Sequence, residues 1–338
     1  MKKLSKATIC SAPITTQNFI DHNNIDLSNA TLSSVSIPHL YQRDNSRNSL
    51  AVIAIMDRLY DFENSSTSIL LNSGISTAYL IAISRRFKRL LVHKDVYYDM
   101  KNAYCIHPNY LEIDENFSDF QEGDLLCIEY CSVPWCKKLL TQDLINKAKL
   151  ANCKICVDCS TSSALNVDLG LIHQVDIAIE SLSKLANGLN NSIIGYMHVK
   201  DNDDYLALNT LKSACGFYAE PLSCYLTQLG LRTLPLRMKK IQENANKLQT
   251  FIDSNFSDIY YTCDLSAGMF YFFPDIDETF ERQLKHKLAL LRYAGTFGAG
   301  FTVWSAAEDC SFVRVSLGIE DIEDLFEEFK VFFNKMLE

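Results

Sequence analysis

The sequence lacks long apolar runs and dense basic runs. No stretch approaches the roughly 20 apolar residues of a membrane-spanning helix, and the opening MKKLSKATICSAPITT has no apolar core of the signal-peptide type. The 32 Lys and Arg residues are scattered and outnumbered by 41 Asp and Glu, for a net charge of −9. This balance disfavours a nucleic-acid or anionic-membrane surface. We therefore expect a cytoplasmic protein whose partners are small molecules, with no nucleic acid and no membrane among them.

Internal repeats and low-complexity tracts are also absent, and the 338 residues are 48% hydrophobic, enough for a sizeable core. Residues 1–45 are polar and irregular, typical of an arm. In residues 46–212, short β-rich runs alternate with helix-period segments, which predicts a large α/β domain with a mainly parallel sheet. In residues 213–338 a long helical segment, two strand-like runs and a final amphipathic helix predict a smaller C-terminal α+β domain.

Twelve cysteines are present, and three of them, Cys153, Cys156 and Cys159, show the C-x-x-C-x-x-C spacing of some metal sites. The surrounding KICVDCS is β-leaning, so its side chains alternate and Cys156 faces away from Cys159. No second C-x-x-C or His pair completes a ligand set. We predict no metal site and interpret the cysteines as reduced, buried hydrophobic residues.

Lys184 lies in DIAIESLSKLANG, where a β-branched run stops at two serines flanking a leucine. One interpretation is a solvated lysine at a strand end, the usual place for a lysine. A second is the S-x-x-K arrangement, in which Lys184 activates Ser181; it requires a helix, whereas VDIAIE alternates like a strand, and the chain has no K-T-G or S-D-N partner. A third is that Lys184 carries an aldehyde cofactor as a Schiff base.

The third interpretation makes predictions elsewhere in the chain. A cofactor of the pyridoxal type needs a carboxylate to keep its ring nitrogen protonated, and VDCSTSS supplies Asp158 at the end of a strand one βαβ unit before Lys184. Its phosphate needs backbone N–H groups at a helix N-terminus, and Gly74 and Ile75 in NSGISTAYL precede a helix-like segment. The sequence is therefore consistent with a cofactor site built from strand ends.

Five segments carry a family resemblance: VDCSTSS, ESLSKLANG, GLRTLPLRMKKIQENANKL, TFGAG and VRVSLGIEDIEDL. Together they resemble the Cys/Met-metabolism family of pyridoxal-phosphate enzymes, which holds the cystathionine synthases and lyases and methionine γ-lyase. The similarity runs in order from about Tyr41 to the C-terminus. It implies the α/β fold of pyridoxal-phosphate fold type I, the aspartate aminotransferase-like fold, and pyridoxal 5'-phosphate as cofactor.

The resemblance also implies a role for each matching residue of the cofactor site. Lys184 matches the family's aldimine lysine and Asp158 matches its pyridinium partner. Phosphate binding is implied for four residues: Ser181, Ser183, Gly74 and Ile75.

Further roles follow from three other matching segments. Tyr97, in DVYYDM, matches the tyrosine that stacks on the cofactor ring and serves as acid or base. Arg314 matches the arginine that grips the substrate α-carboxylate, a task suited to a guanidinium fork, and Thr296 stands where the family has a serine. Tyr41 and Arg43 match residues that reach into the neighbouring subunit's site, which implies a homodimer or a dimer of dimers with shared active sites.

The chain departs from the family pattern at the substrate side. Val133 replaces the asparagine that contacts cofactor and substrate carboxylate, Tyr98 and Asp99 replace two glycines, and Gly295 replaces the glutamate of some γ-acting members. The chain is also shorter, through a trimmed N-terminal arm and a deletion between Tyr261 and Gly268.

Two hypotheses about function follow. In the first, the chain is a lyase or γ-synthase that catalyses β- or γ-elimination or replacement on a sulfur-containing or O-activated amino acid. In the second, it is a degenerate relative that acts as a non-catalytic binding or scaffold protein. The retention of Lys184, Asp158, Arg314 and Tyr97 favours the enzyme.

Overall fold

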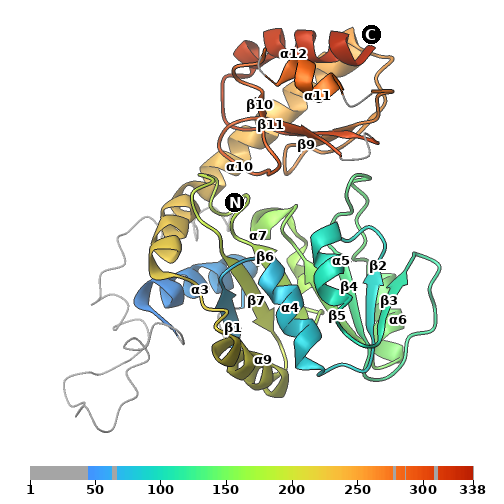
Figure 1. The fold of residues 1–338 in the computed structure, drawn as a ribbon, viewed down its shortest axis with the longest axis vertical. Coiled ribbons are helices and arrows are strands. Elements are labelled where there is room, and N and C mark those ends of the chain that lie inside the picture. Colours follow the sequence, from blue (N-terminus) through green and yellow to red (C-terminus); the bar gives the residue numbers. More distant parts are fainter. Residues whose placement is uncertain (1–44, 63–66, 277–278, 286, 308–310, 338) are drawn as a thin grey trace.

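The computed structural model describes residues 45–62, 67–276, 279–285, 287–307 and 311–337. The predicted arm contacts of Tyr41 and Arg43 lie outside these residues. The described chain forms a larger lower body around one sheet and a smaller upper body around another, and α10 runs between them (Figure 1).

The larger body is built on a seven-stranded sheet. From one edge to the other the strands are β1 (Ser68–Leu71), β7 (Gly195–Val199), β6 (Ile177–Ser181), β5 (Lys154–Asp158), β4 (Leu125–Glu129), β2 (Leu90–His93) and β3 (Tyr110–Ile113). The strands from β6 to β3 pair in parallel, whereas β7 is antiparallel to both of its neighbours. The mainly parallel sheet predicted from the sequence is confirmed.

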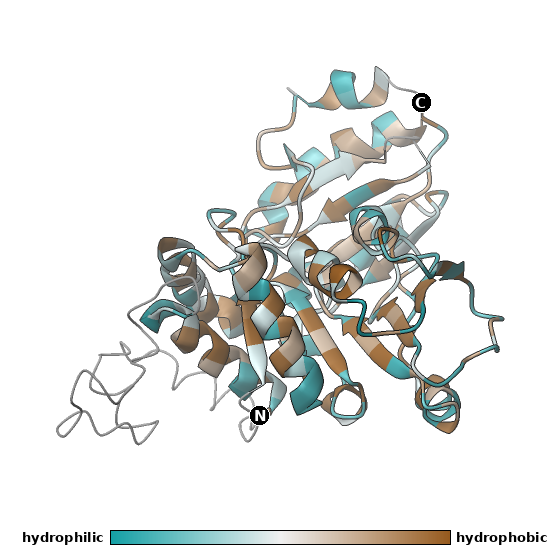
Figure 2. Ribbon diagram, turned by 60° about the horizontal axis from the view of Figure 1, so that its bottom comes forward, coloured by the Kyte–Doolittle hydropathy of each residue, from teal (hydrophilic) through white to brown (hydrophobic). Residues whose placement is uncertain are grey.

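Helices cover both faces of this sheet. One face packs against α3 (Arg47–Tyr60), α6 (Gln142–Leu150), α7 (Ser163–Asn166), α8 (Leu169–Ile172) and the first half of α10 (Pro221–Asn255). The other face packs against α4 (Ile75–Ser84), α5 (Tyr98–Tyr104) and α9 (Asn202–Cys215). Strands buried on both faces read as continuous apolar runs, and Figure 2 shows this hydrophobic colour along the central sheet.

The cysteines of KICVDCS divide between the two faces, as the alternation predicts. Cys153 and Cys159 pack in the core on one side of β5, and Cys156 packs in the core on the other side. Among the described residues, no three His, Cys, Asp or Glu side chains are grouped to hold a metal ion.

The smaller body has a five-stranded sheet in the order β10 (Arg292–Tyr293), β11 (Val303–Ala306), β12 (Val313–Ser316), β9 (Met269–Phe272) and β8 (Tyr261–Asp264). It packs against α11 (Thr279–Leu284), α12 (Ile322–Leu337) and the second half of α10. The predicted division between residues 212 and 213 falls inside α9 and stays a prediction.

Two local details differ from the sequence-based expectations. The strand-like run RLLVHKDVYY ends as a strand at His93, and its last residue begins α5, because Tyr98 to Tyr104 turn away from the sheet over α4. The strand β3 was not predicted, since its residues are mostly exposed and lack an apolar run.

Candidate active site

The candidate site lies at the carboxyl ends of the parallel strands, where loops converge in folds of this kind. A cavity of about 750 Å³ is lined by Asp158 at the end of β5, Lys184 after β6, Tyr97 after β2 and Arg314 of the smaller body. A second cavity, of about 1000 Å³, adjoins it and also contacts Tyr97 and Lys184. The tertiary structure thus brings residues from both bodies to one place.

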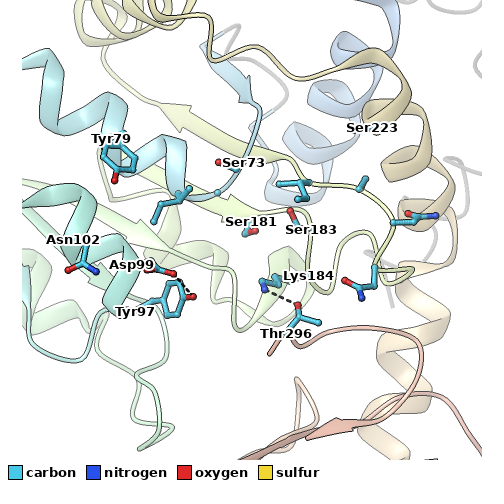
Figure 3. Close-up of a pocket in the computed structure, with 16 residues that line it drawn as sticks. Ser73, Tyr79, Tyr97, Asp99, Asn102, Ser181, Ser183, Lys184, Ser223 and Thr296 are labelled. Atoms are coloured by element: carbon cyan, nitrogen blue, oxygen red, sulfur yellow. Dashed lines mark hydrogen bonds between the residues drawn. The ribbon is translucent and has the colours of Figure 1, made fainter. Parts of the chain in front are cut away.

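Lys184 lies in a turn that follows β6, not on a helix, so the S-x-x-K interpretation is wrong. Its Nζ donates to Oγ1 of Thr296 over 2.9 Å (Figure 3). The same atom lies 4.9 Å from the centre of the Phe297 ring. Burial, with a smaller contribution from the charge of Arg314, lowers the pKa of Lys184 to about 8. A buried amine with this pKa is a good nucleophile and base near neutral pH.

Asp158 ends β5 and pairs in register with Glu129 on one side and Ile179 on the other. Its Oδ1 accepts hydrogen bonds from the backbone N–H of Ser160 over 2.8 Å and from the Ser160 hydroxyl over 2.5 Å. Burial raises the pKa of this carboxyl, and the bonds from Ser160 oppose that effect. Within the described residues no cation pairs with Asp158, so a protonated ligand nitrogen would supply the missing charge.

Arg314 projects from β12 into the same cavity. Its guanidinium donates to the carbonyl of Thr296 over 3.0 Å and to the hydroxyl of Ser305 over 3.1 Å. Burial lowers the pKa of Arg314, and no carboxylate among the described residues forms an ion pair with it. A partly buried guanidinium without an anionic partner is suited to bind a carboxylate from a ligand.

The start of α4 borders the larger cavity. A Cβ added to Gly74 would lie only 2.7 Å from Cβ of Ser181, so the backbone approaches the end of β6 closely. Because the first N–H groups of a helix lack intrahelical partners, Gly74 and Ile75 present donors to the cavity. Ser181 and Ser183 line the same cavity (Figure 3), although the Ser183 hydroxyl also accepts from the backbone N–H of Ile194 over 3.0 Å.

Tyr97 stands at the wall between the two cavities with its side chain half exposed. Its hydroxyl donates to Oδ2 of Asp99 over 2.7 Å, and its backbone N–H donates to Oε1 of Glu129 over the same distance. Burial, followed by the bond to Asp99, raises the pKa of Tyr97. Glu129 was missed in the sequence, although a carboxylate ending an apolar strand was the signal that identified Asp158.

The four substitutions that depart from the family pattern all line the two cavities: Val133, Tyr98 and Gly295 the smaller one, and Asp99 the larger one. Val133 places an aliphatic side chain there and precedes a cis peptide bond to Pro134. Gly295 contributes no side chain, and a Cβ added to it would meet nothing within 4 Å. At Val133 and Gly295 the cavity wall is therefore less polar and more open than the family pattern predicts.

Comparison with known proteins decides the family. The family described as Cys/Met metabolism PLP-dependent enzyme matches residues 6–267. The chain belongs to this family. Pyridoxal 5'-phosphate is the family's cofactor, as the resemblance implied.

Two bacterial relatives illustrate the similarity. A cystathionine gamma-synthase/O-acetylhomoserine (thiol)-lyase of Bacillus subtilis is 24% identical over 309 residues, which cover 82% of this chain and 81% of that protein. A cystathionine gamma-synthase of Haemophilus influenzae is 26% identical over 206 residues, and the match spans 54% of each protein.

Solved structures confirm the fold. The metB structure from Corynebacterium glutamicum superposes with a TM-score of 0.76 at 19% identity, covering 92% of this chain and 90% of that one. Cystathionine gamma synthase from Xanthomonas oryzae pv. oryzae gives a TM-score of 0.75 at 19% identity, with 91% of each chain covered. The fold is the predicted pyridoxal-phosphate fold type I. In the part of the chain that the structure describes, no helix has the length and apolar character needed to span a bilayer.

The residues present fit the cofactor. Lys184 offers a partly buried amine with a lowered pKa, and Asp158 offers a carboxylate with no cation partner in the described part of the chain. A side chain at Gly74 would clash with Ser181, so the glycine lets the start of α4 lie close against the end of β6, beside the cavity that both residues line.

Proposed function

We propose that this protein catalyses a β- or γ-elimination or replacement on a sulfur-containing or O-activated amino acid, as a carbon–sulfur lyase or γ-synthase. The observation that carries the proposal is the convergence of Lys184, Asp158 and Arg314 on one cavity from three separate segments. A partly buried amine, together with a carboxylate and a guanidinium that form no ion pair among the described residues, is costly to keep unless a ligand uses these groups.

Lys184 is the residue that would attach the cofactor aldehyde and then move a proton at the substrate α-carbon. When bound, pyridoxal phosphate supplies an electron sink for the negative charge that develops there. Asp158 would keep the ring nitrogen protonated, and Thr296 orients the Lys184 amine through the 2.9 Å bond.

The phosphate would be held by backbone donors of Gly74 and Ile75 and by the hydroxyls of Ser181 and Ser183, with the dipole of α4 adding attraction. Tyr41 and Arg43 of a neighbouring copy would complete this phosphate site, in a homodimer or a dimer of dimers. This part of the proposal rests on the sequence, since both residues lie outside the described ones.

The substrate would be oriented by Arg314, whose two donors match a carboxylate. Tyr97 would stack on the cofactor and exchange a proton with the leaving group. Because Val133 cannot make the contact that the family asparagine makes, Arg314 would carry a larger share of carboxylate binding in this chain.

The test is to add pyridoxal phosphate to the purified protein and follow absorbance in the near-visible region. Borohydride should then fix the cofactor to the peptide containing Lys184, and Lys184→Ala should lose this label. Cysteine, cystathionine, homocysteine, methionine and O-acylated homoserines are then tested for spectral change and keto-acid release. A protein that gains no absorbance would refute the enzyme and leave the non-catalytic alternative.

A further inference from the structure

Glu129 is a buried carboxyl group at the cavity that the proposed chemistry does not use. It is the last residue of β4, and it pairs in register with Asp158 on the adjacent parallel strand. Only 3% of its surface is exposed, and it lines the cavity together with Tyr97 and Lys184. A buried acid at this position requires a physical explanation.

The two oxygens of Glu129 have different surroundings. Oε1 accepts a hydrogen bond from the backbone N–H of Tyr97 over 2.7 Å. Oε2 is buried and has no hydrogen-bond partner among the described residues. Tyr97 precedes α5, and no side chain of its own caps that helix, so the contact with Glu129 ties this loop directly to the central sheet.

The groups around Glu129 disfavour a negative charge on it. Its titratable neighbours are Asp158 on β5, Cys131 after β4 and Asp95 in the loop before Tyr97, and the hydrogen bond from the Tyr97 N–H opposes their effect. Tyr271 of β9 also faces it. None of these is a cation, and no ion pair to Glu129 forms in the described part of the chain. Burial and the neighbouring Asp158 raise the pKa of Glu129 well above its usual value.

We propose that Glu129 is a positioning residue that holds Tyr97 at the cavity wall through the Tyr97 backbone, and that it does so as an uncharged acid. A neutral carboxyl oxygen still accepts the N–H, while its proton removes an unpaired charge beside Asp158. Asp158 then remains the carboxylate available to a ligand cation. The inference rests on the proposed function for the role of Tyr97, but its tests need no turnover.

The charge state is tested by the pH dependence of unfolding of the full chain and of Glu129→Gln, which is neutral at every pH. If the folded protein holds Glu129 protonated, the unfolded chain alone releases that proton as pH rises above about 4.3. The unfolding constant of the wild type should then grow relative to Glu129→Gln, by about tenfold per pH unit, until the folded pKa is reached.

The matched control is Glu122→Gln, at an exposed position, whose unfolding constant should keep a fixed ratio to the wild type. A ratio for Glu129→Gln that also stays constant between pH 5 and 8 would show a charged Glu129 and overturn the proposal.

The positioning role is tested by amide hydrogen exchange of the peptide that contains Tyr97. Glu129→Met keeps the length but removes the acceptor, so exchange at Tyr97 should accelerate at least tenfold. Glu129→Gln retains an acceptor and should leave it unchanged. If the methionine variant does not fold, Glu129→Asp, which withdraws the carboxyl by one CH₂, gives the same comparison. Equal protection in all variants would refute the role, whether or not the protein proves to be an enzyme.

Discussion

The hydroxyl of Tyr97 donates a 2.7 Å hydrogen bond to the carboxylate of Asp99, two residues further along the chain. The family pattern has a glycine where Asp99 stands, so the acceptor is a feature of this chain. A carboxylate that accepts from the phenol favours its protonated form. Tyr97 is thereby kept as a proton donor over a wider pH range.

Asp99→Asn removes that negative charge, so the pKa of Tyr97 should fall, while burial, the larger cause, keeps it above the ordinary value. If Tyr97 donates a proton in the reaction, the alkaline limb of the kcat/KM profile should move to lower pH in this variant. Asp143→Asn, at an exposed helix position, should leave the profile unchanged. An alkaline limb that does not move would remove Tyr97 from the acid–base role.

Lys184 should attach pyridoxal phosphate at a rate that depends on pH. Only the neutral amine is a nucleophile, so with a pKa of about 8 the rate should rise about tenfold per unit below pH 8 and level off above it. Arg314→Gln removes a nearby cation and should shift this plateau to higher pH. Stopped-flow absorbance measures both, and a plateau near pH 10.5 in the wild type would contradict the burial argument.

Substitutions at Asp158 and at Arg314 should change different kinetic constants. Asp158→Asn should retain cofactor but lower kcat on the order of 100-fold, because charge stabilisation in the transition state is lost. Arg314→Lys should mainly raise KM, by about tenfold, the equivalent of one charge-assisted hydrogen bond of roughly 1.5 kcal/mol. Steady-state kinetics distinguish them, and near-normal values for both would show that the site is misplaced.

If each active site is built from two chains, two inactive variants should recover activity when they form mixed dimers. Lys184→Ala and Arg43→Ala should each be inactive. In mixed dimers one site receives both defects and the other none, so co-refolding equal amounts should restore roughly a quarter of wild-type activity. If Arg43 acts within its own chain, every site keeps a defect and activity stays at background. The double variant mixed with wild type controls for simple stabilisation by a folded partner.

Gly230 should not tolerate alanine, although helix propensity alone favours the change by up to about 1 kcal/mol. A Cβ at this position of α10 would lie 1.9 Å from the carbonyl oxygen of Asn187, in the turn after Lys184. We expect a loss of about 3 kcal/mol in the free energy of unfolding in urea. Gly295→Ala, where a Cβ meets nothing within 4 Å, is the matched control. A stabilised Gly230→Ala would refute the close packing of α10 on this turn.

The sequence by itself determined the parts of the protein that follow from local patterns. Apolar β-branched runs alternating with helix-period segments specify a parallel sheet, because each element buries its own apolar face. Asp158 and Lys184 were identified because parallel strands deliver their last residues to a common edge. The family motifs added Arg314 and Tyr97, which no local pattern distinguishes from ordinary surface or core residues.

Only the tertiary structure decided how these groups act on one another. The bond from Lys184 to Thr296 joins residues 112 positions apart, and the lowered pKa of Lys184 depends on burial that both bodies supply together. Glu129 ends its strand as Asp158 does. Yet the Glu129 carboxyl accepts a hydrogen bond from the loop at Tyr97, whereas Asp158 pairs with no cation among the described residues. Local sequence sets which residue ends a strand, whereas burial, partners and neighbouring charges depend on segments that meet only after the chain has folded.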